Sequence, residues 1–318
     1  MHTLYIVIPC YNEWEVLPET ARRLSQKLDT LMAAGMISRS SRVLLVDDGS
    51  RDGTWSLIKT IRVSDSRFDG LRLSRNRGHQ NALLAGLMTA RRYADMVISM
   101  DADLQDDMNA VDSMVRKFED GCDIVYGVRS ARAMDTAFKR RTAQGFYKII
   151  NRLGGELVYD HADYRLLSRR ALDALSEYSE VNLFLRGVVP MLGFKTGAVE
   201  YARGERFAGE SKYPLKKMLE FAIEGLTSLT TQPLRLITLL GGGILAVSLL
   251  LLLSFVIAAI FGSAFSAARL LLVSVFFMGG LVLLCLGVVG EYVGKIYLET
   301  KRRPHYHIDE HLHDSTNA

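Results

Sequence analysis

The stretch DMVISMDADLQDD, residues 95–107, decides how this chain folds. It opens with a short apolar run, residues 96–100, that has the length and residue types of a buried strand. Asp101 and Asp103 follow this run directly, at positions i and i+2. A buried strand that leads straight into carboxylates is typical of an open parallel sheet, because ligands bind there beyond the carboxyl ends of the strands.

The same alternation of strand and helix extends to both sides of this stretch. Strands are predicted at 4–8, 42–46, 70–73, 96–100 and 124–128, and helices between them at 15–33, 53–63, 79–93 and 108–119. This order predicts an α/β fold with a mostly parallel, Rossmann-like sheet and helices on both faces. Beyond residue 128 the pattern weakens, with short helices expected at 142–153, 171–177 and 183–191 and a last strand at 195–201.

Polar clusters follow each of the first four predicted strands. They read PCYNE at 9–13, DDGS at 47–50, SRNRGH at 74–79 and DADLQ at 101–105. One such cluster alone would be an ordinary turn or helix cap, because Asp, Ser and Gly favour those places. Four clusters on one edge of the sheet indicate a binding site instead.

The carboxylate pair in the fourth cluster is predicted to hold a divalent cation. Asp101, Asp103 and the amide of Gln105 supply oxygen ligands, which Mg²⁺ and Mn²⁺ prefer. Mg²⁺ typically takes only one or two protein carboxylates and completes its shell with water and phosphate oxygens. Two carboxylates at this spacing are common in loops by chance. Their place directly after an apolar strand makes them a specific signal of a cation site.

Two long uncharged stretches lie in the C-terminal part. No charged residue occurs from Ile237 to Ala268 or from Leu270 to Gly290, and each stretch can cross a bilayer core of about 30 Å as a helix. Buried core helices are the alternative, but soluble helices of this length rarely lack a polar face. We predict membrane helices at about 234–260 and 270–292.

Basic residues flank these stretches on the outside. Lys212, Lys216, Lys217 and Arg235 precede the first, Lys295, Lys301, Arg302 and Arg303 follow the second, and the turn carries only Arg269. The positive-inside rule predicts a multi-pass hairpin in the plasma membrane with both ends cytoplasmic. The basic flanks would also bind anionic membrane lipids.

These features divide the chain into four parts. Residues 1–212 form the predicted cytoplasmic catalytic domain, 213–233 an interfacial helix, 234–294 the membrane hairpin and 295–318 a cytoplasmic basic tail. The interfacial helix is predicted from apolar residues at helical spacing. A helix that faces the core is the alternative.

Composition excludes several other classes. A net charge of +4 is too modest to indicate nucleic-acid binding. The three cysteines lie too far apart for a disulfide framework or a zinc site, which suits a reducing cytoplasm. Residues 1–9 read as a strand rather than a signal peptide, so the catalytic part is expected to stay in the cytoplasm.

Together these motifs resemble the inverting glycosyltransferases of the GT-A fold. Within them, the chain is most similar to polyprenyl-phosphate glycosyltransferases, which include dolichyl-phosphate mannose synthases and bacterial bactoprenol glucosyltransferases. The resemblance covers residues 1–303 and is carried by IPCYNE at 8–13, DDGS at 47–50, RNRGH at 75–79, DADLQD at 101–106 and RFAGESKY at 206–213.

The resemblance implies a metal-dependent hexosyltransferase that inverts the sugar. It would move the sugar from a nucleotide-sugar onto a polyprenyl phosphate such as undecaprenyl phosphate, at the cytoplasmic membrane face. UDP-glucose or a related uridine diphosphate sugar is the expected donor, and GDP-mannose, as in the mannose synthases, is the alternative. The enzymes that it resembles most supply sugars for cell-envelope polymers.

The resemblance also implies roles for single residues. The donor would lie against Pro9, Tyr11, Glu13, Asn76 and one of Asp47 and Asp48. Asp101 would lie near the ribose and diphosphate, while Asp103 with Gln105 would hold the metal. Asp163, in the segment DHADYR, matches an acidic residue near the acceptor and is counted with Asp101 and Asp103 as catalytic.

Basic side chains are expected to bind the phosphate groups. Arg203, Arg206, Ser211 and Lys212 lie on or beside the loop that would contact phosphates, and Arg129, Arg132 and Arg140 are candidates for the acceptor's phosphate. A solvated or lipid-facing basic patch is the alternative for these last three. A phosphate monoester has a second pKa of about 6, so it needs little help from a base. Asp163 could therefore position a substrate as well as accept a proton.

Three rival functions fit the sequence less well. A processive polysaccharide synthase would carry more spans and a late QxxRW motif, which is absent. A membrane scaffold without catalysis would not need the intact DAD and RFAGESKY motifs. A nucleotidyltransferase would want a phosphate loop with glycine and lysine after the first strand, and IPCYNE has neither. Gly241, Gly242, Gly243, Gly279 and Gly280 would permit a homo-oligomer through close helix approach, or would simply tolerate bending.

Overall fold

The computed structural model of the chain describes residues 1–129, 161–180, 184–202 and 267–313, together with single residues between 237 and 257. Its strands are β1 (Leu4–Cys10), β2 (Arg42–Asp47), β3 (Phe68–Leu73), β4 (Met96–Ser99), β5 (Ile124–Arg129), β6 (His161–Ser168), β7 (Thr196–Tyr201) and β8 (Ile308–Leu312). Its helices are α1 (Leu17–Ala33), α2 (Thr54–Ser64), α3 (His79–Ala90), α4 (Ala110–Glu119), α6 (Arg169–Leu175), α7 (Leu185–Met191) and α10 (Ala267–Thr300).

The described strands form one sheet in the order β7-β5-β6-β4-β1-β2-β3-β8. The central strands β4, β1, β2 and β3 run parallel, and β7 runs parallel to β5. Strand β6 is inserted antiparallel between β4 and β5, and β8 is antiparallel to β3 at the edge. The carboxyl ends of the parallel strands therefore share one edge with the beginnings of β6 and β8, and this edge is called the active edge below.

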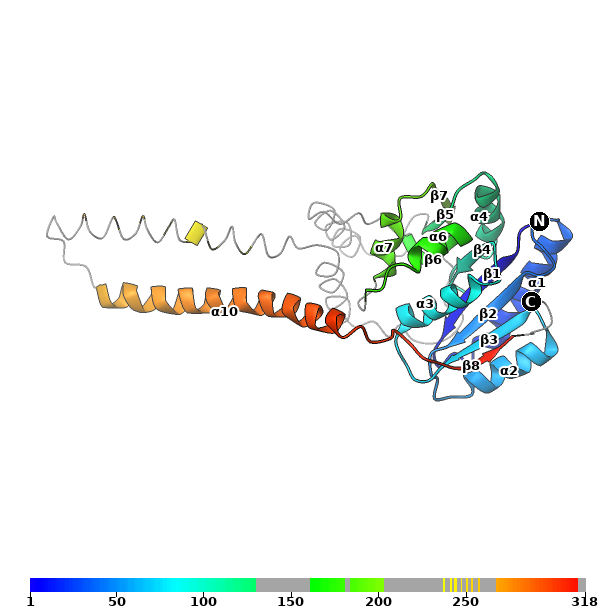
Figure 1. The fold of residues 1–318 in the computed structure, drawn as a ribbon, viewed down its shortest axis with the longest axis horizontal. Coiled ribbons are helices and arrows are strands. Elements are labelled where there is room, and N and C mark those ends of the chain that lie inside the picture. Colours follow the sequence, from blue (N-terminus) through cyan, green and yellow to red (C-terminus); the bar gives the residue numbers. More distant parts are fainter. Residues whose placement is uncertain are drawn as a thin grey trace.

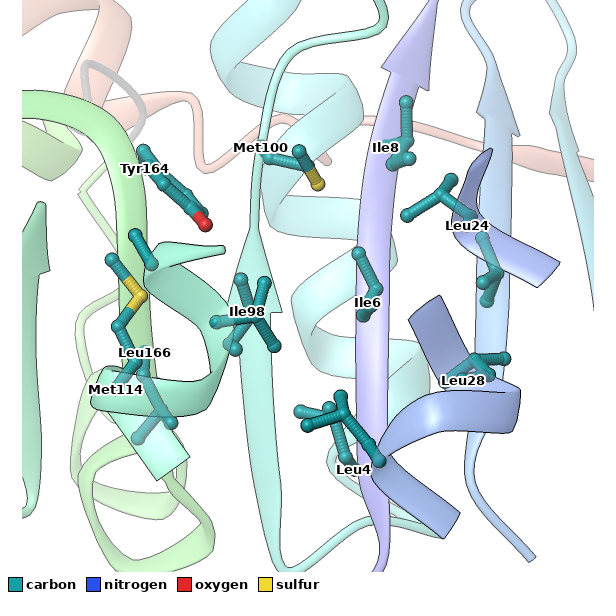
Figure 2. Packing of buried hydrophobic residues seen from close by; sticks show 14 of the residues in the cluster. Leu4, Ile6, Ile8, Leu24, Leu28, Ile98, Met100, Met114, Tyr164 and Leu166 are labelled. Atoms are coloured by element: carbon teal, nitrogen blue, oxygen red, sulfur yellow. The ribbon is translucent and has the colours of Figure 1, made fainter. Parts of the chain in front are cut away.

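Helices cover both faces of the sheet (Figure 1). Alternate residues of β1 face opposite sides, so Ile6 packs in one core with α1 and α4, while Val7 packs in the other with α3 and α6. Each buried aliphatic side chain contributes roughly 1.5–3 kcal/mol. Figure 2 shows part of the first core, with Leu4, Ile6, Ile8, Leu24, Leu28, Ile98, Met114 and Leu166 among the labelled residues.

The mostly parallel α/β sheet confirms the predicted fold class. Each of the first five predicted strands is present, and the four helices between them begin and end within a few residues of their expected bounds. The predicted helix at 142–153, the interfacial helix at 213–233 and most of the span at 234–260 lie outside the described residues.

Two strands were not predicted. No strand was expected between residues 153 and 171, whereas His161–Ser168 forms β6 in the middle of the sheet. No strand was expected in the tail either, whereas Ile308–Leu312 forms β8. Both strands carry charged residues whose partners lie far away in the sequence, so no local pattern marks them.

Helix α10 extends away from the α/β domain (Figure 1). Within it, residues Phe277–Thr300 are long and apolar enough to cross a membrane, with a mean hydropathy of 1.8 over the most apolar 18 residues, none of which is buried. It is the only such helix among the residues that the structure describes. This exposed apolar stretch overlaps the second predicted span, residues 270–292.

The chain returns from α10 to the sheet. The segment 301–307 reaches the active edge, where the Ser74 N–H donates to the carbonyl of His307 at 3.0 Å. Strand β8 then pairs with β3, and the indole N–H of Trp55 donates to Glu310 at 3.1 Å. His313 lies 2.8 Å from the buried carboxylate of Asp69. The apolar helix is thus joined to the outermost strand of the α/β domain.

Candidate active site

The first two polar clusters lie side by side on the active edge. Asn12 adopts a left-handed backbone conformation, with φ of 54°, directly after β1. Its N–H donates to the Ser50 hydroxyl at 3.0 Å, and its side-chain oxygen accepts from the N–H of Arg51 at 2.9 Å. The N–H of Glu13 donates to Thr54 at 3.0 Å. The PCYNE and DDGS loops therefore form one surface.

Asp48 joins the second cluster to the third. Its two carboxylate oxygens accept from the backbone N–H groups of Arg77, at 2.7 Å, and Gly78, at 2.9 Å. Gly49 beside it has φ of +64°, and a Cβ there would lie 2.6 Å from the backbone of Arg75 and Asn76. Asp48 therefore holds the RNRGH loop in place. The expected contact of Asp48 with a nucleotide base stays a prediction.

Asp47 is more deeply buried than its neighbour, with no exposed surface. Its Oδ1 accepts from the Ser50 N–H at 3.1 Å, and its buried Oδ2 has no hydrogen-bond partner among the described residues. Burial raises the pKa of Asp47, although the hydrogen bonds from Ser50 and the charge of Arg72 oppose this. The other expected donor contacts lie on the same edge: Pro9 is buried, Glu13 is half-buried, and Tyr11 and Asn76 are exposed.

The DAD loop follows β4 at the centre of the active edge. The Thr20 hydroxyl of α1 donates to the carbonyl of Ala102 at 2.9 Å and fixes the loop from behind. The Gln105 N–H donates to Asp103 at 3.2 Å. Between them Leu104 has φ of 60°, a conformation that costs a residue with a side chain about 1–2 kcal/mol and that concentrates at functional sites.

The loop fits a divalent cation. Among the residues that the structure describes, no three His, Cys, Asp or Glu side chains gather closely enough to hold an ion by themselves. Asp101, Asp103 and Gln105 are partly exposed oxygen donors on one strained turn. This donor set suits an ion that takes the rest of its shell from water and phosphate.

Across β4 from the loops that follow β1, β2 and β3, Asp163 lies at the centre of a charged cluster on β6. Arg165, which is 1% exposed, donates to its Oδ1 at 2.5 Å. Arg186 of α7 donates through Nε to Oδ1 at 3.1 Å and through Nη2 to Oδ2 at 2.8 Å. His79 lies 3.5 Å from Asp163 and 3.8 Å from Asp101. The predicted residues Asp101 and Asp163 are thus brought together through His79.

The surrounding charges keep Asp163 ionised. Burial by itself would raise the pKa of Asp163, but the charge of Arg186, a hydrogen bond with His79 and the charge of Arg165 hold this pKa well below its ordinary value. Asp101 behaves in the opposite way. Loss of hydration and the neighbouring carboxylates raise the pKa of Asp101, with His79 opposing. A carboxylate as acidic as Asp163 is a poor proton acceptor at neutral pH.

A third group closes the site on the side of β5 and β7. The Tyr201 hydroxyl donates to the buried Asp106 at 2.6 Å and accepts from Nε of Arg129 at 3.3 Å. Burial and the nearby charge of Asp101 raise the pKa of Asp106 to about 6. Gln105 and Asp106 also line a cavity of 480 Å³ between this loop and α1. Arg129 lies at the end of β5 and contacts Tyr201, and its expected role at the acceptor's phosphate stays a prediction.

The remaining predicted residues lie outside the described part of the chain. They are Arg132, Arg140, Arg203, Arg206, Ser211 and Lys212. Conversely, Arg165 and Arg186 were not expected at the site. A signal existed for Arg186 alone, because it is an arginine within the apolar segment FLRGVVPM, residues 184–191, where a charge needs a partner.

Comparison with known proteins identifies the family. The model of glycosyl transferase family 2 matches residues 5–176, which include the loops after β1 to β4 and Asp163. The chain belongs to glycosyl transferase family 2. Together with the mostly parallel sheet, this membership confirms the GT-A α/β fold that the motifs imply.

Relatives of this family 2 chain match it along nearly its whole length. The glycosyltransferase YkoT of Bacillus subtilis is 49% identical over 98% of this chain and 92% of its own. The bactoprenol glucosyl transferase of Shigella phage SfX is 37% identical over 95% of this chain and 97% of its own. Among solved structures, mannosyl-3-phosphoglycerate synthase from Rubrobacter xylanophilus has a TM-score of 0.49 at 14% identity, covering 73% of this chain and 75% of that one.

Proposed function

We propose that this chain transfers a sugar from a nucleotide-sugar onto a polyprenyl phosphate, with inversion and with the help of Mg²⁺ or Mn²⁺, at the cytoplasmic face of a membrane. The observation that carries the proposal is the layout of the active edge. Loops suited to a nucleotide follow β1 to β3, the carboxylate pair follows β4, and the Asp163 cluster lies on β6 beyond it. Donor and acceptor would then meet over β4.

The relatives support the choice of substrates. A relative that is 37% identical over nearly the full length of both chains is named a bactoprenol glucosyl transferase, which favours a polyprenyl phosphate as the acceptor and glucose as the sugar. We infer UDP-glucose or a related uridine diphosphate sugar as the donor. GDP-mannose is the alternative, because none of the described contacts ties a residue to a particular base or sugar hydroxyl.

The charges on the active edge suit this reaction. When the sugar–phosphate bond breaks, negative charge develops on the departing nucleoside diphosphate, and a divalent cation bound by Asp103 and Gln105 would stabilise that charge. Arg206 and Lys212, expected beside the phosphates, would add to this effect. The phosphate acceptor is mostly doubly ionised at neutral pH, so it can attack without losing a proton to the protein.

Asp163 would accordingly position groups rather than act as a base. Both of its oxygens are engaged by arginines, and its pKa lies well below the ordinary value. The variant Asp163→Asn tests this reading through the dependence of kcat on pH. A slower enzyme with the same pH profile supports positioning, whereas loss of the acidic limb alone would identify Asp163 as a base.

Membrane attachment follows from the acceptor. Each buried CH₂ of a prenyl chain is worth about 0.8 kcal/mol, so the lipid stays in the bilayer and the enzyme must work at its surface. The exposed apolar helix α10 would anchor the chain there, with Lys301, Arg302 and Arg303 just beyond its end. A hairpin with both ends cytoplasmic, and assembly through the helix glycines, stay predictions.

A transfer assay tests the proposed function directly. Purified full-length chain is mixed with undecaprenyl phosphate and a panel of labelled nucleotide-sugars, and labelled lipid is extracted. We expect a lipid-linked sugar from UDP-glucose that requires Mg²⁺ or Mn²⁺ and is lost in the double variant Asp101→Ala, Asp103→Ala. Transfer to lipid at full rate by this double variant, or no transfer from any donor by the wild type, would overturn the proposal.

A further inference from the structure

The chain between α10 and β8 runs along the RNRGH loop, which follows β3. This connecting segment, residues 301–307, is called the strap below and is drawn in red in Figure 1. The N–H of Ser74, just before the loop, donates to the carbonyl of His307 at 3.0 Å. The guanidinium of Arg77, within the loop, donates to the carbonyl of Pro304 at 3.5 Å. The strap therefore contacts the loop region at two points.

Covering the open edge of β3 explains β8 but not the strap. Strand β8 pairs with β3 from Gly70 to Leu73, and the last pair joins Leu73 to Ile308. The register shifts between Arg72 and Leu73, the kind of irregularity that redirects a chain. Hydrogen bonding then continues to Ser74, which lies beyond the end of β3. Protection of a strand edge needs no contact beyond the strand, so the strap has a role at the loop itself.

Tyr306 anchors the strap at this place. Its side chain is half-buried and packs against the core that contains α3, the helix into which the RNRGH loop leads. The residue before it is also close to the loop. Burial lowers the pKa of His305, the charge of Glu299 opposes this, and the charge of Arg77 adds to it. His305 therefore lies near both the end of α10 and the loop.

The RNRGH loop carries its position into the site. Between β3 and α3 it forms no regular structure, so the contacts of the loop determine where it lies. On one side Asp48 accepts two of its backbone N–H groups, and on the other side the strap holds it. Its last residue, His79, lies 3.8 Å from Asp101 and 3.5 Å from Asp163. A shift of the loop would thus reach both carboxylates.

We propose that the strap positions the RNRGH loop for binding of the nucleotide-sugar donor, so that the affinity for a nucleoside diphosphate depends on the segment that leaves the apolar helix. This inference rests on the proposed function, in which the donor lies against this loop. The strap would act through the loop, so its residues are positioning residues and not catalytic ones. Because coupling between two sites is reciprocal, a bound nucleotide should in turn hold the strap more firmly.

Two substitutions, one on the strap and one on β8, test the inference. Tyr306→Ala removes the anchor of the strap beside the loop. Leu312→Ala is the matched control, because it removes a partly buried contact at the far end of β8, where Leu312 pairs with Gly70. Both should lower the melting temperature, whereas only the first should loosen the loop. Tyr306→Phe keeps the ring and should restore the wild-type behaviour.

Nucleotide binding and donor kinetics are measured on the detergent-purified full chain, well below the melting temperature of each variant. UDP and GDP are each titrated with Mg²⁺ present. We expect Tyr306→Ala to weaken binding of the preferred nucleotide roughly 3- to 10-fold, the loss of about one hydrogen bond. The donor KM should rise by a similar factor while the acceptor KM stays unchanged. Leu312→Ala and Tyr306→Phe should bind the nucleotide like the wild type.

Amide hydrogen exchange gives a readout that does not depend on activity. In Tyr306→Ala, exchange should become faster in peptides that contain Ser74 and the RNRGH loop. In the wild type, the bound nucleotide should slow exchange in peptides from the strap as well as in the loop. This second measurement needs no variant, so it decides the question even where Tyr306→Ala does not fold.

Three results would go against these expectations. Equal nucleotide binding in the wild type, Tyr306→Ala and Leu312→Ala, or equal weakening by both substitutions, would overturn the inference and leave the strap as part of the cover of β3. Exchange in the wild-type strap that does not respond to the nucleotide would overturn it as well. A wild type that binds neither UDP nor GDP and transfers no sugar would instead contradict the proposed function, and the inference with it.

Discussion

Replacing Gly49 by alanine should damage both stability and donor binding, by an amount that the structure allows us to work out. Gly49 has φ of +64°, and alanine in this left-handed region costs about 1–2 kcal/mol. The added Cβ would also lie 2.6 Å from backbone atoms of Arg75 and Asn76, which cannot move aside as a side chain can. Overpacking of this kind costs a further 1–3 kcal/mol or so.

Gly193→Ala provides the matched control for this substitution. Gly193 has φ of +69°, almost the same as Gly49, but a Cβ there would meet nothing within 4 Å. It lies just after α7 and not in one of the loops that follow β1 to β3. The control should therefore lose only the conformational part, and the difference between the two variants isolates the steric part.

Thermal unfolding and nucleotide binding together measure the effect. For a domain of this size each 1 kcal/mol lowers Tm by roughly 2–4 °C, so the steric part of about 1–3 kcal/mol should make Gly49→Ala melt roughly 2–12 °C below Gly193→Ala. Because the displaced backbone belongs to the RNRGH loop, Gly49→Ala should also bind nucleoside diphosphate more weakly, while Gly193→Ala should not. Equal melting and equal nucleotide binding in the two variants would refute the close approach of these loops.

Three further results are expected. With chelator present, Asp106→Asn should be more stable than the wild type, and this difference in unfolding free energy should rise between about pH 4 and pH 6 to roughly 3 kcal/mol and then stay level, because a carboxyl whose pKa is raised to about 6 costs folding stability as it ionises. A difference that does not depend on pH, in urea or thermal melts, would contradict this. Asp103→Asn should raise the Mg²⁺ concentration for half-maximal transfer at least tenfold, while Asp107→Asn in the same loop should leave that concentration at the wild-type value. The same Mg²⁺ concentration for half-maximal transfer in both variants would show that Asp103 does not belong to the cation site. Deleting residues 308–318 should lower the free energy of unfolding by about 2 kcal/mol and cause self-association in size-exclusion chromatography, because it removes the packing of the partly buried Leu312 against the core and opens the edge of β3. An unchanged melting curve and a monodisperse profile would show that β8 is dispensable.

The predicted part of the fold is the part that local patterns specify. Strands β1, β2 and β4 consist mainly of buried apolar residues, and β1 for example is buried along its whole length. Strand β6 escaped prediction because it opens with His, Ala and Asp and carries the buried Arg165, which bonds both to Asp163 of the same strand and to the distant carbonyl of Leu185. Strand β8, IDEHL, is largely exposed, so its register depends on pairing with β3 rather than on its own hydrophobicity.

The candidate site divides in the same way. Asp101 and Asp103 were predictable because a strand end places them, and the structure puts the loop that carries them at the centre of the active edge. The contact of Arg186 with Asp163 was not predictable, since α7 is brought to β6 by packing between distant segments. Asp48 shows a third case, where the residue was expected at the site and the structure adds a task, holding the loop at Arg77 and Gly78.

The return of the chain from α10 to β3 also sets an order of assembly. Strand β8 follows the apolar helix in the chain, so the outer edge of β3 stays open until all of α10 has been made. Open strand edges are prone to pair with other chains, and growing polypeptides fold as their segments emerge. The nascent chain would thus close its sheet last, after this apolar helix has been synthesised.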